Sequence, residues 1–248
     1  MPVGRPLVLG HRGASADAPE NTLAAFREAI RQGADGVELD VQLCATGEVV
    51  VAHDETLERV SGEKLSVRGT PFSRLREVDV GRHFSERFAG ERVPTLAEVL
   101  EALPPNAVVD VELKCDALRD GGLTERALEV ISRYPGRPIV VTSFNPVCLL
   151  RARMGAPSLP LGALWEEPRW TRAREIAARA AEIAVVAPHH PLCGKEMVAR
   201  WHERGFAVAS WTVDEPAEIE RCVESGVDVI ITNRPGLAQD VVKRLVRK

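Results

Sequence analysis

Apolar runs of strand length alternate with helical patterns eight times along this chain of 248 residues. The expected strands are Leu7–Leu9, Gly36–Leu43, Val108–Leu113, Ile139–Thr142, Leu159–Leu164, Ile183–Ala187, Ala207–Thr212 and Val227–Thr232. The expected helices are Thr22–Arg31, Thr95–Leu103, Thr124–Tyr134, Pro146–Met154, Ala173–Ala181, Glu196–Arg204, Pro216–Ser225 and Pro235–Val246. A strand followed by a helix is typical of a parallel sheet, and eight such units in about 250 residues favour a closed barrel. We therefore predict an α/β fold, a (β/α)8 TIM barrel, with residues 1–248 forming a single domain.

One interval breaks this alternation. Residues 49–54, VVVAHD, have the pattern of a further short strand, and residues 55–93 are then polar and rich in turn-forming residues. A loop of this length without structure of its own is uncommon in a compact domain. We therefore predict a small insertion after the second barrel strand, with local structure that includes a short helix at Ser73–Val78.

Composition limits the classes of partner. A net charge of −4 gives no electrostatic basis for binding nucleic acid or an anionic membrane. No stretch approaches the roughly 18 apolar residues of a membrane span, and the first residues do not resemble a signal peptide. The five cysteines are scattered and odd in number, as expected for reduced thiols. We expect a cytoplasmic location without stable membrane association, and the sequence leaves the oligomeric state open.

Two of the expected strands carry acidic residues in alternation with apolar ones. Glu38 and Asp40 alternate with valines and leucine in one strand, and Asp110 and Glu112 do so in the next, followed by Lys114. Successive side chains of a strand point to opposite faces, so these polar residues share the face toward the barrel axis. Solvated acids on half-exposed strands are the alternative, but parallel strands are normally covered on both faces. Carboxylates gathered in this way suit Mg²⁺ or Ca²⁺.

Two histidines follow apolar runs at the same predicted end of the barrel. His11 ends the first strand and is followed by Arg12, while His53 ends the short strand before the insertion. The carboxyl ends of the strands form the functional face of such barrels. Two imidazoles can take and give a proton, and Arg12 with Lys114 can bind a phosphate. A structural or surface role is the alternative for either histidine taken alone.

Several motifs together resemble the glycerophosphodiester phosphodiesterase family. They are HRGASADAPENT, ELDVQL with VVAHD, DVELK, PTLAEVLEALP, TSFNP, SWTVDEP and GVDVIITNRP, and they cover nearly the whole chain in the expected order. The resemblance implies a (β/α)8 barrel with a segment inserted after the second strand. It also implies an enzyme, a phosphoric diester hydrolase that uses a metal ion to convert small-molecule glycerophosphodiesters into sn-glycerol 3-phosphate and an alcohol.

The resemblance further implies roles for the matching positions. These are His11 and His53 as the general acid/base pair, Arg12 and Lys114 as phosphate ligands, and Glu38, Asp40 and Glu112 as ligands of one divalent ion, Mg²⁺ or Ca²⁺, with Mn²⁺ a further candidate. Glu20 and Asn21 match the PENT motif, where Glu20 either organises the site or complements the dipole of the following helix.

Aromatic residues at the predicted mouth complete the set. The resemblance implies that Trp211 packs against the glycerol moiety and that Phe144 contacts the substrate, with ordinary core packing as the alternative for each. Asn233 stands where many relatives carry Asp, and we expect it to cap the helix that begins near Pro235. The adjacent His189 and His190 are expected to diverge and to shape the substrate site or lie at the surface.

Other functions remain open at this point. One is a lysophospholipase D-type phosphodiesterase acting on lysophospholipids, although the mostly polar stretch PFSRLREVDVGRHFSERF of the insertion favours small soluble diesters. Another is a barrel that binds phosphorylated ligands without turnover. The sequence does not determine the alcohol head group, the metal, which histidine is the acid, or whether water or the glycerol 2-hydroxyl is the nucleophile.

Overall fold

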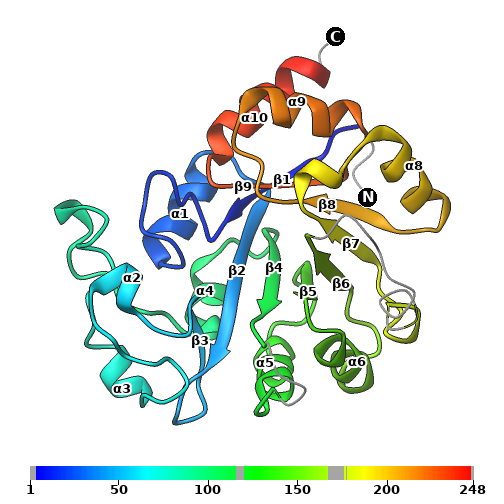
Figure 1. The fold of residues 1–248 in the computed structure, drawn as a ribbon. Helices are drawn as coiled ribbons and strands as arrows, with labels where there is room; N and C mark the ends of the chain where they lie inside the picture. Colours follow the sequence, from blue (N-terminus) through cyan, green and yellow to red (C-terminus); the bar gives the residue numbers. More distant parts are fainter. Residues whose placement is uncertain (1–3, 116–119, 167–175, 177, 247–248) are drawn as a thin grey trace.

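Eight parallel strands form a closed barrel in the computed structural model of this chain, which describes residues 4–115, 120–166, 176 and 178–246. The barrel strands are β1 (Leu7–His11), β2 (Gly36–Leu43), β4 (Val108–Leu113), β5 (Ile139–Ser143), β6 (Leu161–Trp165), β7 (Val185–Pro188), β8 (Ala207–Ser210) and β9 (Val229–Thr232). Each strand pairs with the next, and β1 also pairs with β9, which closes the sheet. The predicted TIM barrel is confirmed, and Figure 1 shows the strands with helices around them.

The helices between the strands begin and end close to the predicted positions. They are α1 (Leu23–Arg31), α4 (Leu96–Ala102), α5 (Leu123–Ile131), α6 (Pro146–Gly155), α8 (Lys195–Glu203), α9 (Pro216–Glu224) and α10 (Pro235–Val246). Local capping fixes two of these starts. The Thr22 hydroxyl accepts a hydrogen bond from the Ala25 amide, and Thr95 forms a capping box with Glu98. Residues 173–175 and 177 of the helix predicted at Ala173–Ala181 lie outside the described residues.

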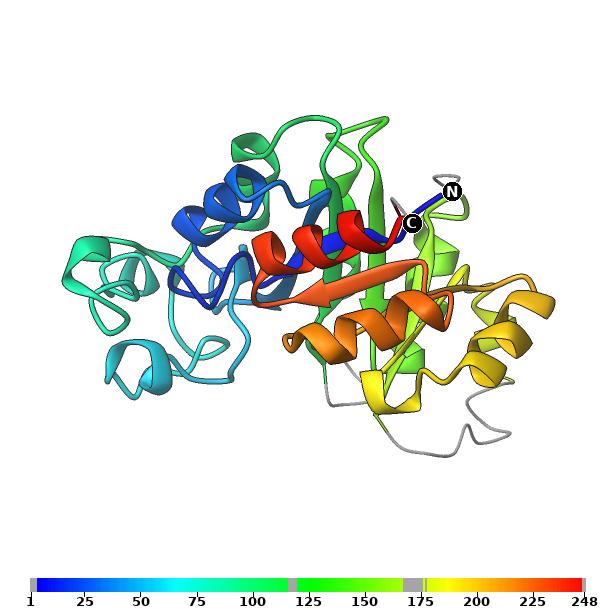
Figure 2. The same cartoon turned by 90° about the horizontal axis from the view of Figure 1, so that it is seen from above.

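The insertion is a small structured lobe, as predicted. It follows β3 (Val49–Val51), which pairs antiparallel with β2, and contains α2 (Glu58–Ser61), α3 (Phe72–Leu75) and the 3-10 turn η1 (Glu86–Phe88). Leu57, Val67 and Leu75 are buried in a core of its own. Figures 1 and 2 show the lobe extending from one side of the barrel.

The barrel strands separate two layers of side chains. The apolar residues of β2 and β4, such as Val37 and Val109, are buried in the main core that the helices cover. Leu9, Leu164 and Ile231 belong to a smaller cluster inside the barrel. His11 lies two residues after Leu9 on β1 and therefore points inward above it. The barrel interior is thus apolar in one layer and polar toward the carboxyl ends of the strands.

Candidate active site

The acidic residues of β2 and β4 meet in the barrel interior. The two strands pair in register, with Glu38 opposite Asp110 and Asp40 opposite Glu112. All four residues are buried. One carboxylate oxygen from each of Glu38, Asp40 and Glu112 lies within 4.8 Å of the others, which makes these three the candidate metal ligands. Lys114 Nζ donates to Glu112 Oε1 at 2.9 Å and lies 3.8 Å from Asp40 Oδ1.

The crowded carboxylates carry a strong electrostatic penalty. Burial and the neighbouring charges of Asp40, Glu112 and Asp110 raise the pKa of Glu38 well above its usual range. Burial, with a further contribution from Asp40, raises the pKa of Glu112 to about 7. Asp40 Oδ1 is buried and accepts no hydrogen bond from the described residues. Three hard oxygen ligands, mutual repulsion and an unsatisfied oxygen together fit a divalent cation of the Mg²⁺ or Ca²⁺ type.

Arg12 connects the metal-ligand cluster to the loop before α1. Its backbone amide donates to Glu38 Oε2 at 3.0 Å, its Nε lies 3.1 Å from Asp40 Oδ2, and its Nη1 donates to Glu20 Oε1 at 3.0 Å. Asn21 Nδ2 also donates to Asp40 Oδ2, at 2.9 Å. Arg12 and Asn21 both adopt left-handed backbone conformations, with φ of 55° and 56°. Such angles are uncommon for residues other than glycine and cluster at functional sites.

The contacts of Glu20 distinguish its two possible roles, organising the site or complementing the dipole of α1. The side-chain cap of α1 is Thr22, so Glu20 precedes the helix and is not part of its first turn. Its carboxylate instead pairs with Arg12 and with Arg59 of the insertion. Burial alone would raise the pKa of Glu20, but these two arginines outweigh it and hold the pKa below its usual range. The geometry therefore favours an organising role for Glu20 over a helix-dipole role.

His11 is held in one orientation by residues far along the chain. Its Nδ1 lies 2.7 Å from Asn233 Oδ1, and Asn233 Nδ2 donates to Asp214 Oδ2 at 2.6 Å. A carboxylate only accepts, so Asp214 fixes the orientation of the amide, and the amide oxygen then requires a hydrogen on His11 Nδ1. His11 Nε2 is left for chemistry, 3.9 Å from Glu38 Oε2. Burial and the charge of Arg12 lower the pKa of His11.

The expectation that Asn233 caps α10 is wrong. Its side-chain oxygen accepts from His11 and faces the Ser15 hydroxyl at 2.6 Å, while the amide of Gly236 in the first turn of α10 donates to Gln32. The rule that Asn before a helix caps its first turn fails here because the Asn233 side chain is hydrogen-bonded to His11 and Asp214 at the barrel mouth.

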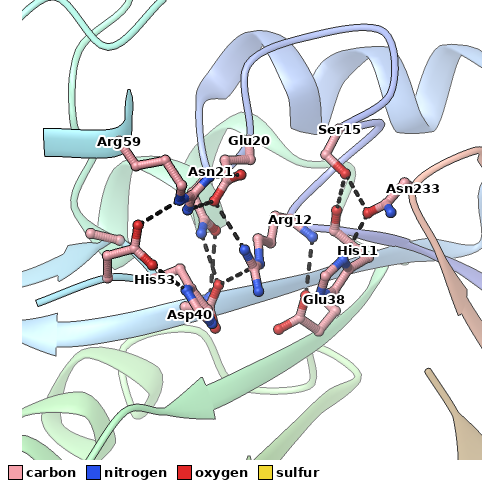
Figure 3. Close-up of polar contacts among 12 residues, drawn as sticks. His11, Arg12, Ser15, Glu20, Asn21, Glu38, Asp40, His53, Arg59 and Asn233 are labelled. Atoms are coloured by element: carbon pink, nitrogen blue, oxygen red, sulfur yellow. Dashed lines mark hydrogen bonds and ion pairs between the residues drawn. The ribbon is translucent and has the colours of Figure 1, made fainter. Parts of the chain in front are cut away.

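His53 has a carboxylate partner of its own. Its Nδ1 lies 2.7 Å from Asp54 Oδ1, and Asp54 Oδ2 accepts from Arg59 Nε at 2.6 Å. The carboxylate requires the hydrogen on His53 Nδ1, which leaves Nε2 for chemistry in the same way as in His11. Figure 3 shows His11 and His53 on opposite sides of Arg12.

A cavity of about 60 Å³ joins these groups. Its walls include His11, Arg12, His53, Lys114, Phe144 and Trp211 together with the carboxylates of Glu38, Asp110 and Glu112. A wider, open groove of about 330 Å³ shares His53, Lys114, Phe144 and Trp211 with this cavity but does not include His11. The structure thus brings together at one mouth the histidines, the cations and the aromatic residues that the sequence singled out.

The two aromatic residues form one wall. The rings of Phe144 and Trp211 meet edge to face with centroids 5.6 Å apart, and Trp211 Nε1 donates to the Ala187 carbonyl at 2.8 Å. Phe144 is 39% exposed, which excludes ordinary core packing for it. Trp211 is partly exposed and lines both the cavity and the groove, so it also has a face open to a ligand.

His189 and His190 lie beside this wall and do not diverge as expected. Their rings contact each other with centroids 4.9 Å apart, because the chain turns into the 3-10 helix η2 (His190–Leu192) immediately after β7. His190 contacts Glu218 and Arg221, whereas His189 packs on Trp211. Neither lines the cavity described above.

Four residues of the site were missed by the sequence interpretation. They are Ser15, Asp54, Arg59 and Asp214. Asp54 directly follows His53, and Asp214 lies in the quoted motif SWTVDEP, so each had a local signal. Arg59 had none, because its partners lie on a loop and a strand end that only the fold brings near α2.

Comparisons with known proteins agree with this geometry. The sequence profile of the glycerophosphoryl diester phosphodiesterase family matches residues 11–237. A protein of Caldanaerobacter subterraneus subsp. tengcongensis named glycerophosphodiester phosphodiesterase is 36% identical over 250 residues, covering 98% of this chain and 99% of that protein.

Solved structures show the same similarity. An Oleispira antarctica phosphodiesterase, in complex with its product sn-glycerol-3-phosphate, has a TM-score of 0.88 and 27% identity, covering 96% of this chain and 97% of that one. The glycerophosphodiester phosphodiesterase of Agrobacterium tumefaciens has a TM-score of 0.80 and 27% identity, covering 95% of this chain and 99% of that one.

Within the described part of the chain, none of the helices has the length and apolar character needed to cross a membrane.

Proposed function

The chain belongs to the glycerophosphoryl diester phosphodiesterase family, and from this premise we propose that it hydrolyses glycerophosphodiesters to sn-glycerol 3-phosphate and an alcohol. The observation that carries the proposal is the convergence of two oriented imidazoles and two cations at one cavity, whose walls also include two of the three clustered carboxylates, Glu38 and Glu112. The likeness to a phosphodiesterase bound to sn-glycerol-3-phosphate supports the same small-molecule substrate class.

Arg12 and Lys114 hold the phosphodiester group in this proposal. Glu20 and Asp40 engage two sides of the Arg12 guanidinium, so its orientation is fixed before substrate arrives. A guanidinium carries five N–H donors, and those left over can bind phosphate oxygens in bidentate fashion. Lys114 contributes a second positive charge from the end of β4, where its Nζ lies 2.9 Å from Glu112 Oε1 and 3.8 Å from Asp40 Oδ1.

His11 and His53 transfer the protons. Both rings keep Nε2 for the substrate because Asn233 and Asp54 engage their Nδ1 atoms. His53 lines both the cavity and the open groove, whereas His11 lines only the cavity. In this proposal one imidazole takes the proton from the nucleophile and the other gives a proton to the leaving oxygen.

Glu38, Asp40 and Glu112 would hold one divalent ion, Mg²⁺ or Ca²⁺, with Mn²⁺ a further candidate. When bound, such an ion supplies positive charge that offsets the negative charge developing on the phosphoryl oxygens. Lys114 and Arg12 both lie close to Asp40. The same two positive side chains therefore face the carboxylates and the substrate phosphate in this proposal. Trp211 and Phe144 supply the apolar surface against which the glycerol moiety packs.

The insertion is bound to α4 through Arg76 and Glu98 and to the site through Arg59, which supports a single domain over residues 1–248. The five cysteines are all buried and unbridged, which supports a reducing, cytoplasmic location.

The test is product identification. The purified protein is incubated with glycerophosphocholine, glycerophosphoethanolamine, glycerophosphoglycerol, glycerophosphoinositol and a lysophospholipid, each with Mg²⁺, Ca²⁺, Mn²⁺ or EDTA. We expect sn-glycerol 3-phosphate from the water-soluble diesters and loss of activity in EDTA. Release of lysophosphatidate from the lipid alone would replace this function with that of a lysophospholipase D, and binding without turnover would remove the enzyme assignment.

A further inference from the structure

One side chain of the insertion, Arg59, contacts both the carboxylate that pairs with His53 and a carboxylate that pairs with Arg12. Arg59, on α2, donates from Nε to Asp54 Oδ2 at 2.6 Å and from Nη1 and Nη2 to the two oxygens of Glu20 at 2.7 Å each. Asp54 is the carboxylate that orients His53, and Glu20 is one of the two carboxylates that orient Arg12, the other being Asp40. Figure 3 shows the Arg59 guanidinium beside Glu20 and on the side of the network where His53 lies.

We infer that Arg59 is a positioning residue that sets the distance between the proton-transferring imidazole of His53 and the phosphate-binding guanidinium of Arg12. The inference rests on the proposed function for its chemistry, but the contacts that carry it do not depend on the substrate. Arg59 touches neither of the residues it acts on, and it reaches each through one carboxylate.

The shape of the guanidinium explains why arginine stands here. Its planar fork meets the two oxygens of Glu20 along one edge while Nε faces Asp54, so one rigid group fixes two carboxylates. A lysine is a single point charge and cannot hold both in a fixed relation. Burial opposes ionisation of Asp54, but the hydrogen bonds from Arg59 and His53 outweigh it and hold the pKa of Asp54 below its usual range. Both partners are therefore anionic acceptors at neutral pH.

The position of Arg59 also gives the insertion a function. His53 stands between β3 and α2, whereas Arg12 follows β1, and β3 is itself a short addition to the barrel. Hydrogen bonds from α2 back to the loop before α1 hold this segment at the mouth. Catalytic groups must be kept within about 0.5 Å of their productive geometry, which a loop alone seldom achieves.

Arg76 provides a matched control. It lies in the same insertion, is similarly half-exposed and also donates twice to one carboxylate, that of Glu98, at 2.8 and 2.5 Å. Its partner lies on α4, so it ties the insertion to the barrel without touching the candidate site. A loss of activity that comes only from loosening the insertion would appear in both arginine variants.

The test compares Arg59→Gln, Arg59→Lys and Arg76→Gln by steady-state hydrolysis of the best water-soluble diester. We expect Arg59→Gln to lower kcat/KM about 10- to 100-fold, mainly through kcat, as is typical when a partner of a functional residue is removed. Arg59→Lys should recover only part of this loss, and Arg76→Gln should stay within about twofold of the wild type. Equal losses in Arg59→Gln and Arg76→Gln, or full rescue by lysine, would overturn the inference.

A double-mutant cycle identifies the route of the effect. If Arg59 acts on His53 through Asp54, the losses of Arg59→Gln and Asp54→Asn will be strongly non-additive, and the double variant will resemble Asp54→Asn alone. Fully additive losses would contradict that route.

A readout without turnover separates this inference from the proposed function. Long-range ¹H–¹⁵N NMR spectra of the imidazoles report which ring nitrogen carries the hydrogen. We expect the Nδ1–H form of His53 in the wild type and in Arg76→Gln, and a mixture of tautomers in Arg59→Gln. If no diester is hydrolysed, the proposed function fails while this spectrum still decides the inference, and an unchanged His53 tautomer in Arg59→Gln would contradict it.

Discussion

Replacing Glu112 with glutamine should stabilise the metal-free protein and remove its response to divalent cations. The Glu112 side chain is buried between Asp40 and Lys114, and its pKa is raised from 4.5 to about 7, chiefly by burial. The folded state therefore holds the proton more tightly than the unfolded state. Ionisation of Glu112 therefore does not destabilise the folded protein at a pH below the pKa of this carboxyl in the unfolded chain. The destabilisation is complete once the pH exceeds its pKa in the folded protein.

The magnitude follows from this rise in the pKa. At pH 8 the ionised carboxylate costs the folded state about 3 kcal/mol, because each pKa unit corresponds to about 1.4 kcal/mol. The neutral amide of glutamine has the same shape and removes this cost, although the substitution also removes the negative charge that pairs with Lys114. For a chain of this length the upper limit is a Tm increase of about 6–12 °C at pH 8. At pH 5, only half a unit above the ordinary pKa of 4.5, the gain should fall to about a quarter of its value at pH 8, because the wild-type carboxyl is then protonated in the folded state but still partly ionised in the unfolded state.

The assay is unfolding of Glu112→Gln and wild type at pH 8 and pH 5, first in EDTA and then with Mg²⁺ or Ca²⁺ added. Asp110→Asn is the matched control: Asp110 is also buried with a pKa raised to about 7, but it is not one of the three clustered ligands. We expect both variants to gain stability in EDTA at pH 8, and only Asp110→Asn to keep the cation-dependent increase in Tm. A Glu112→Gln protein that is less stable than wild type in EDTA at pH 8, or that still responds fully to the cation, would refute the reasoning.

Two other variants test the parts of the site that face the substrate. Asn233→Ala leaves His11 Nδ1 without its acceptor, so we expect kcat/KM to fall about 10-fold or more with KM little changed, since one lost hydrogen bond to a buried group costs about 1–3 kcal/mol. An unchanged kcat would contradict this. Trp211→Ala removes the apolar wall beside Phe144 and should raise KM for the diester by a larger factor than it lowers kcat, as measured by initial rates. The opposite split would remove Trp211 from substrate binding.

The fold could be predicted because hydrophobic periodicity records which face of a strand is covered. The apolar residues Val37 and Val109 mark the helix-facing side of β2 and β4, so the acids Glu38 and Glu112 had to face the barrel interior. The place of His11 and His53 could be predicted for a related reason, since both follow apolar runs that end at the barrel mouth. These inferences need only local pattern and the closure of the sheet.

The residues that orient the histidines could not be predicted in the same way. Asn233 lies 222 positions from His11, and only the pairing of β1 with β9 brings them together. Local rules favoured a helix cap for Asn233, but its side chain instead forms a short hydrogen bond with the buried imidazole of His11. Arg59 belongs to a helix of four residues with no pattern of its own, so its ion pair with Glu20 is visible only in the folded structure.

The central claim is that His11 and His53 carry out proton transfer at one phosphodiester. The most direct measurement is single-turnover release of sn-glycerol 3-phosphate by His11→Ala and His53→Ala with saturating divalent cation, beside the wild type. General acid/base catalysis contributes about 10²- to 10⁴-fold, so we expect each variant to lose at least about 100-fold in rate while still folding and binding the diester. Near-normal release of sn-glycerol 3-phosphate by either variant would contradict the account.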